Sequence, residues 1–334
     1  MPRSGALRFP PADRDHRKDP GFRLRHPLLG GAPHFAVGSV IPVHRRGRPD
    51  SSVGLLHNPR RVVRVLVSVD MEGVAGVVAP EDIMPGHAEY ERNRTYMTDE
   101  ASAAVRGILA YEANASVVVC DAHAGYRNLL PDRIDRRCTL LRGSPRSHGM
   151  LTGIDGDVDA VCFVGYHGKA VTTRSVLAHT ISGGTIARVR CNGHELGETG
   201  LNAALAAYYG AVPVLATGDD TLAREAESVV PGITTVAVKR AFGNRAAEGL
   251  HPEESRARIE AAAETALANR ADVHPLDFAG AVDLEVDVLR PFMTERACLI
   301  PGVELRGALT LGFHAADLPA AYDLIDVFAI LASA

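Results

Sequence analysis

The stretch VVRVLVSVDMEG, residues 62–73, predicts where the sheet of this protein begins. Its first eight residues are rich in β-branched side chains, which predicts a buried strand over residues 62–69. Asp70 and Glu72 follow directly, and residues two apart on an extended chain point to the same side. Two neighbouring carboxylates repel each other unless a positive charge lies between them. The two carboxylates at the end of this buried strand therefore predict a cationic partner nearby.

Short β-branched runs alternate with helical stretches after this strand. Further strands are predicted at 115–121, 158–166, 185–191, 212–217 and 234–239, with helices at 98–113, 201–209, 221–230 and 252–269. Asn192-Gly193 is typical of a hairpin turn. The alternation predicts an α/β fold, with a mostly parallel sheet flanked by helices.

The pattern changes after residue 272. VDLEVDVL at 282–289 and GALTLGF at 307–313 predict strands, and residues 315–331 predict a closing helix. We therefore expect an α/β core over residues 61–271 and a smaller C-terminal α+β part over residues 272–334. The smaller part is either a second domain or a layer added at the edge of the core.

The first sixty residues differ from both parts. They hold 9 of the 20 prolines and show no sustained apolar period. They carry 11 Lys and Arg against 4 Asp, a net charge of +7, whereas the other residues carry 25 basic against 36 acidic groups, or −11. We expect residues 1–60 to be a disordered basic, proline-rich extension without the apolar segment of a signal peptide. An over-extended gene start and a basic binding tail are the alternatives.

The composition excludes several classes of protein. Hydrophobic residues make up 46% and charged residues 23% of the chain, as in globular proteins with a full core. The acidic body argues against nucleic acid as a partner, and no run reaches the ~18 apolar residues of a membrane helix. The five cysteines are scattered, never in a CxxC pair, which excludes a disulfide framework and a thiolate zinc site. This cysteine usage predicts a reducing, cytoplasmic location.

Three predicted strands end in similar side chains. Asp70 and Glu72 follow the first strand, Asp121 and His123 the second, and His167 the third. The carboxyl ends of parallel strands meet at one edge of a sheet, so these side chains are expected to converge. Carboxylates and imidazoles together suit zinc or a similar divalent ion. The sequence therefore predicts a metal site at this edge.

Two later segments offer further candidates. In NGHELGETGLNAALAAYYG, residues 192–210, Glu198 stands at the start of a predicted helix and Asn202 lies on the same helical face. Glu198 either faces the positive end of its own helix or turns outward as a ligand. His179, in SVLAHTISG at 175–183, is a ligand, a catalytic group or neither. Asp121 either orients His123 from behind or simply caps the end of its strand.

Six blocks in fixed order carry a family resemblance. They are SVDMEG at 68–73, DAH at 121–123, GYHG at 165–168, AHTISG at 178–183, NGHELGETGLNA at 192–203 and ATGDD at 216–220. Over residues 63–334 the chain resembles the D-aminopeptidase family of dinuclear zinc peptidases, the self-compartmentalising type associated with dipeptide transport. That family has an α/β core with a smaller C-terminal part and assembles as stacked pentameric rings, a homodecamer.

The resemblance implies a role for each residue. It makes Asp70 the bridging ligand of two zinc ions, His179 the catalytic histidine, and gives the other four ligands as Glu72, His123, His167 and Glu198. Compared with the family pattern, this chain has one extra residue between His167 and His179, within KAVTTRS at 169–175. Asp121 and Asn202 are candidates for the shell behind the ligands.

The expected function is that of a cytoplasmic zinc aminopeptidase that releases N-terminal, D-configured residues from short peptides. Two metals that share a hydroxide lower its pKa and polarise the scissile carbonyl, and five ligands leave positions open for water and substrate. A dinuclear amidase that acts on another small amide is one alternative. A non-catalytic peptide-binding protein associated with transport is the other.

Overall fold

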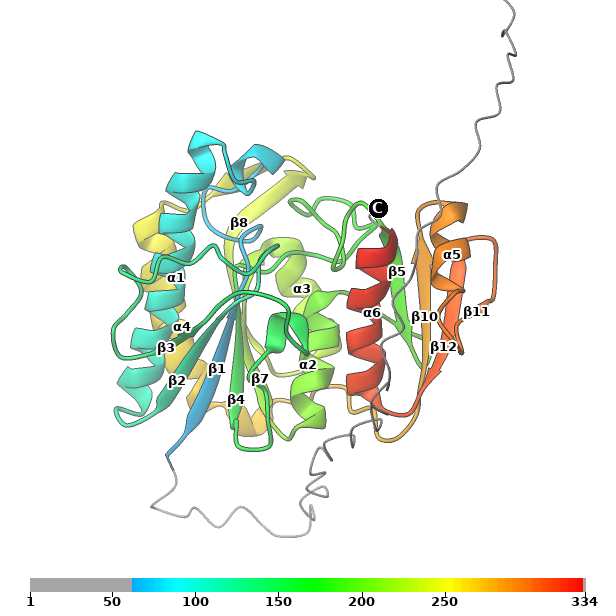
Figure 1. The fold of residues 1–334 in the computed structure, drawn as a ribbon. Helices are drawn as coiled ribbons and strands as arrows, with labels where there is room; N and C mark the ends of the chain where they lie inside the picture. The colour runs from blue at the N-terminus through cyan, green and yellow to red at the C-terminus, as the bar shows by residue number, and fades with distance from the viewer. Residues whose placement is uncertain (1–61, 333–334) are drawn as a thin grey trace, which may run out of the picture. The chain divides into compact units, whose positions relative to one another are not determined.

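A computed structural model of the protein describes residues 62–332, and the predicted extension at 1–60 lies outside them (Figure 1). The larger sheet, sheet A, has the strand order β3-β2-β1-β4-β7-β8-β9, in which only β8 and β9 pair antiparallel. Its strands are β1 (Arg64–Val69), β2 (Ser116–Asp121), β3 (Thr139–Leu141), β4 (Ala160–Val164), β7 (Val212–Asp219), β8 (Thr234–Gly243) and β9 (Ala246–Gly249).

The centre of sheet A determines where the site lies. β1 pairs with β2 on one side and with β4 on the other, so the strand order reverses direction at β1. Val69 at the end of β1 is in register with Asp121 of β2 and Val164 of β4, which places the three strand ends at one level. In open α/β sheets, ligands bind beyond the carboxyl ends of the strands at such a switch point.

Helices cover both faces of sheet A, which confirms the predicted α/β fold (Figure 1). Val65, Val67 and Val69 of β1 pack in the apolar cluster of α1 (Ala88–Tyr111) and α4 (Pro252–Ala268). Leu66 between them belongs to the cluster of α2 (Glu198–Tyr208) and α6 (Leu318–Ala332), because alternate side chains of a strand face opposite sides. α3 (Asp220–Val229) follows β7 directly.

Within residues 62–332, no helix combines the length and the apolar character needed to cross a membrane.

A second, antiparallel sheet, sheet B, has the strand order β11-β12-β10-β5-β6 and packs beside α6 (Figure 1). Residues after 272 supply β10 (Val282–Val288), β11 (Glu304–Leu305), β12 (Thr310–Ala315) and α5 (Pro291–Ala297). Earlier residues supply the hairpin of β5 (Ile186–Cys191) and β6 (His194–Leu196), whose turn at Asn192 and Gly193 has φ of 49° and 80°. The hairpin prediction is confirmed, and sheet B draws on residues from both sides of position 272. The domain bounds themselves stay a prediction.

The first long helix begins ten residues earlier than the sequence predicts. α1 starts at Ala88, and its first turns carry exposed charged residues that lack an apolar period. Thr98 is not the cap of this helix, because its hydroxyl donates to the carbonyl of Arg94 inside the helix at 2.7 Å. Packing against α4 and the burial of Tyr90 and Asn93 in the first turns stabilise the helix.

Candidate active site

The loops that follow β1 and β4 lie directly against each other. The amide of Asp70 donates to the carbonyl of Val164 at 2.8 Å, and that of Gly73 donates to Gly165 at 2.7 Å. A Cβ atom at Gly73 would overlap the carbonyl oxygen of Tyr166, and one at Gly165, where φ is +72°, would overlap that of Asp70. Glycine at both positions therefore allows the approach that brings the two strand ends together.

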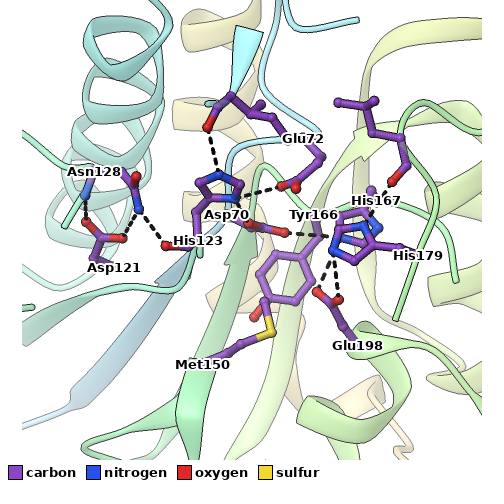
Figure 2. A network of polar contacts seen from close by, with 12 residues as sticks. Asp70, Glu72, Asp121, His123, Asn128, Met150, Tyr166, His167, His179 and Glu198 are labelled. Atoms are coloured by element: carbon purple, nitrogen blue, oxygen red, sulfur yellow. Dashed lines mark hydrogen bonds and ion pairs between the residues drawn. The ribbon is translucent and has the colours of Figure 1, made fainter. Parts of the chain in front are cut away.

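The five predicted ligands converge at this edge of sheet A (Figure 2). Nδ1 of His123 lies 3.1 Å from Oδ1 of Asp70 and 3.0 Å from Oε2 of Glu72. Nε2 of His167 lies 3.3 Å from Oδ2 of Asp70 and 3.3 Å from Oε2 of Glu198. The two oxygens of Asp70 thus face different imidazoles. The side chains form two three-residue donor sets that share Asp70, with the donor atoms of each set within 4.8 Å of one another.

Each imidazole in these sets turns its other nitrogen toward a backbone carbonyl. Nε2 of His123 lies 3.2 Å from the oxygen of Ile83, and Nδ1 of His167 lies 3.0 Å from that of Gly168. A carbonyl oxygen only accepts hydrogen bonds, so these nitrogens donate the proton, and an imidazole that loses its other proton to a metal would turn a lone pair toward the cluster. Histidine ligands of metals are usually oriented in this way.

The burial of this cluster supports a cation between its members. Asp70, Glu72, His123, His167 and Glu198 are all at most 5% exposed. Oε2 of Glu72 and Nε2 of His167 are buried and face other members of the cluster, but in the described residues neither atom meets the geometry of a hydrogen bond. Buried polar atoms in folded proteins nearly always have a partner. Three carboxylates and two imidazoles suit zinc, so the residues present fit the metal that the sequence predicts.

The charge balance of the cluster favours a positive charge beside Asp70 and Glu72. Burial and repulsion from Glu72 raise the pKa of Asp70. Burial lowers the pKa of His123, but the carboxylates of Glu72 and Asp70 outweigh it and hold that pKa well above its usual value. His167 shows the same balance, with Glu198 and Asp70 raising its pKa. The negative potential that draws protons to the imidazoles would equally attract a divalent cation.

Glu198 faces the centre and does not cap its own helix. It stands at the first position of α2, after Gly197, and no side-chain cap is found there. Its Oε1 accepts the amide of Ile181 at 2.6 Å while Oε2 faces His167. Of the two alternatives that the sequence left open, the outward-turned carboxylate is the one observed.

His179 lies beside the five residues and is more accessible than they are. Its ring stacks on that of His167, with centroids 4.1 Å apart and planes 13° apart. Nδ1 lies 2.9 Å from the carbonyl oxygen of Leu177, so Nε2 is free to face Glu198, 3.7 Å from Oε1. The side chain is 22% exposed and lines a pocket. This position is compatible with a catalytic group, and with a ligand, since His179 also forms a donor set with Glu72 and His167.

The two candidates for the shell behind the ligands lie elsewhere. Asp121 accepts the amides of Asn128 and Leu129 at 2.5 and 2.7 Å, so it organises the end of its strand. It reaches His123 only through Asn128, whose side-chain amide donates to the backbone carbonyl of His123 (Figure 2). Asn202 is buried, donates to the hydroxyl of Tyr166 and accepts from that of Tyr322. Within residues 62–332, neither side chain forms a hydrogen bond or an ion pair with a predicted ligand side chain.

Lys239 was not singled out by the sequence, although it lies at the site. It is buried in β8, and its ammonium donates to the carbonyls of Glu72, Val74 and Val77 at 2.6, 2.9 and 2.7 Å. Burial lowers its pKa to about 8, so the ammonium still prevails at pH 7. One side chain therefore fixes the loop that carries Glu72. The only sequence signal is a lysine at the end of an apolar run, TTVAVK at 234–239.

Replacing Lys239 with methionine is expected to destabilise the fold by about 2–4 kcal/mol, because three carbonyls lose a buried charged donor while the apolar stem is kept. Chemical denaturation measures the change. Lys169→Met is the matched control, since Lys169 is the other lysine in the described residues and its half-buried side chain pairs with Glu195. Its loss is expected to cost no more than about 1 kcal/mol. Equal stability of the two variants would show that Lys239 does not hold the loop.

A pocket of about 180 Å³ opens onto the cluster. Asp70, Glu72, His123, His179 and Glu198 line one part of it, and the rest is lined by less polar side chains and one further carboxylate, Asp326. A small molecule can therefore reach the predicted metal ligands from this side.

Comparisons with known proteins identify the family of this chain. The family model described as D-aminopeptidase matches residues 63–327. The D-aminopeptidase of Bacillus subtilis (strain 168) is 32% identical over 272 residues, which cover 81% of this chain and 98% of that protein. A solved structure of DppA from Bacillus subtilis is similar to this chain, with a TM-score of 0.79 and 31% identity. The similarity covers 81% of this chain and 98% of that one. That protein is described as a Zn-dependent D-aminopeptidase and a self-compartmentalizing protease. The chain belongs to the D-aminopeptidase family.

Proposed function

We propose that the protein is a zinc-dependent aminopeptidase that releases N-terminal, D-configured residues from short peptides. The observation that carries the proposal is the pair of buried donor sets that share Asp70. We propose two zinc ions per chain, one held by Glu72 and His123, the other by His167 and Glu198, with Asp70 between them.

The chemistry follows from the groups around the pocket. Bound zinc would supply a Lewis acid that polarises the scissile carbonyl and lowers the pKa of the attacking water. His179 has Nδ1 held by Leu177, so its Nε2 is the atom that holds or moves a proton at the pocket. In the same position it can donate to the oxyanion of the transition state. The five side chains fix the geometry, because all are buried and backbone carbonyls orient the two imidazoles.

The substrate class rests on the family and on the pocket. The relatives that match are described as D-aminopeptidases, which supports a D-configured N-terminal residue. The small volume of the pocket, about 180 Å³, favours short peptides. Because the DppA structure is described as that of a self-compartmentalizing protease, we also propose that this chain forms a homo-oligomer. The pentameric rings and the cytoplasmic location stay predictions.

A hydrolysis panel with D-Ala-Gly, L-Ala-Gly, N-acetyl-D-Ala-Gly and D-alaninamide tests this function. We expect release of D-alanine from D-Ala-Gly, little turnover of the L isomer, and none of the acetylated peptide. Exhaustive chelation is expected to abolish the activity and zinc to restore it, with about two zinc ions per chain by elemental analysis, as in dinuclear hydrolases.

The other outcomes of the panel would each indicate a different function. Turnover of D-alaninamide without turnover of any dipeptide would identify the dinuclear amidase. No turnover, together with substoichiometric metal, would identify a peptide-binding protein. Full activity after exhaustive chelation would exclude the metal mechanism altogether.

A further inference from the structure

The wall of the pocket contains two polar groups that the mechanism above does not use. Asp326 projects from α6 and Tyr126 from the loop after β2. An added Cβ atom at Gly149 would lie 2.8 Å from Oδ2 of Asp326 and 3.3 Å from the hydroxyl of Tyr126. The carboxylate and the phenol therefore converge beside Gly149, which has no side chain to separate them.

Neither group is satisfied by the protein. Within residues 62–332, no hydrogen bond or ion pair is found for the carboxylate of Asp326 or the hydroxyl of Tyr126. The nearby cation, Arg146, lies over the ring of Tyr126, 3.6 Å from its centroid, and donates to the carbonyl of Asp121. A partly buried carboxylate without a partner is costly, and a cation in the pocket would compensate it.

The charge of Asp326 reinforces this need. Burial, together with the negative charges of Asp323 and Glu198, raises the pKa of Asp326 to about 6 against the opposing effect of Arg146. The group is still ionised at pH 7. Three carboxylates of the centre would be neutralised by two divalent ions, so Asp326 is the one carboxylate of the described pocket lining that is left without an ion-pair partner, although Arg146 lies near enough to act on its charge.

The position of Tyr126 links this wall to the metal ligands. The amide of Tyr126 donates to the carbonyl of His123 at 2.8 Å, which closes a turn directly after that histidine. Ala124 and Tyr126 in this turn have φ of 46° and 59°, a left-handed conformation that non-glycine residues adopt at a cost. Such strain is concentrated at functional sites. The turn holds the phenol at a fixed place relative to His123.

We propose that Asp326 and Tyr126 bind the terminal ammonium of the substrate. An ammonium offers three donors and a full positive charge, which suits one carboxylate and one hydroxyl oxygen. The amide nitrogen of an internal residue carries no charge, so this subsite would select the N-terminus of a peptide. The inference rests on the proposed aminopeptidase function and names the groups that make it an exopeptidase.

Glycine and acetate form a matched pair of probes, because both carry a carboxylate and they differ only in the ammonium group. Both are achiral, so the result does not depend on a preference for D residues. With zinc-loaded protein, calorimetry is expected to show tighter binding of glycine than of acetate. In Asp326→Asn the affinity for glycine should fall about 10- to 100-fold, as for a lost charge-assisted hydrogen bond, while acetate changes less than about threefold. Tyr126→Phe should weaken glycine about three- to tenfold, the scale of a neutral hydrogen bond.

Two exposed residues provide the controls. Asp132→Asn removes the same charge, and Tyr111→Phe the same hydroxyl, on the surface and outside the pocket lining. Neither is expected to alter either affinity. Zinc content, measured for every variant, should match the unmodified protein.

The outcomes separate this inference from the function on which it rests. Equal losses for glycine and acetate in Asp326→Asn, or no loss for glycine, would overturn the subsite. The same holds if the unmodified protein binds acetate as tightly as glycine. If no dipeptide is hydrolysed but glycine binds through Asp326, the aminopeptidase proposal fails and the ammonium subsite stands.

Discussion

The substitution His167→Ala is expected to remove metal and activity together. Nε2 of His167 faces both Asp70 and Glu198, and the ring is only 2% exposed, so no water or neighbouring side chain replaces it easily. We expect His167→Ala to lose about one zinc ion per chain and at least about 10³-fold in kcat/KM, because several kcal/mol of Lewis-acid stabilisation are lost. Elemental analysis and steady-state kinetics measure the two effects.

The loss of zinc should be confined to the donor set of Asp70, His167 and Glu198. Glu72 and His123 do not depend on His167 for their contacts, so one ion should remain bound between them and Asp70. His274→Ala is the control, because His274 is exposed and outside both donor sets. It should retain full metal content and activity. A His167→Ala protein that still holds two zinc ions would refute the ligand assignment.

The convergence of these predicted ligands could be expected because of the way parallel sheets are built. Asp70, His123 and His167 follow three strands that pair in register, and the carboxyl ends of such strands share one edge. The type of each residue then indicated a metal, and the order of the blocks indicated the family. What the spacing specified was a place in the sheet, and that place does not depend on side-chain packing.

Other parts of the site depend on contacts that no local pattern encodes. Lys239 reaches carbonyls more than 160 residues away, and Asp326 meets Tyr126 across most of the described chain. The β5–β6 hairpin was predicted, but its pairing with β10 in sheet B was not, because an alternating strand does not specify its partner. The start of α1 was missed for a related reason. Its charged first turns are stabilised by tertiary contacts, including the burial of Tyr90 and Asn93, and not by a local apolar pattern.

His179 poses a sharper question, because its ring stacks on a predicted ligand without belonging to either of the two sets that share Asp70. Its Nε2 is 3.7 Å from Glu198, longer than the distances from His123 and His167 to their carboxylates, and its side chain is 22% exposed at the pocket. A group in this position could act on the reacting atoms while the five buried residues would hold the metal. Its removal should therefore affect the rate and leave the metal in place.

His179→Ala is expected to keep near-normal zinc content while kcat falls about 10²–10⁴-fold, the usual scale for a lost general acid/base or oxyanion donor. KM should change far less, because the lost interaction forms mainly in the transition state. His179→Gln separates the two roles, since an amide can donate to an oxyanion but cannot transfer a proton near neutral pH. Partial recovery in the glutamine variant would assign oxyanion stabilisation, whereas equal loss in both would assign proton transfer. Loss of one zinc ion per chain in the alanine variant would instead make His179 a ligand, in the set that it forms with Glu72 and His167.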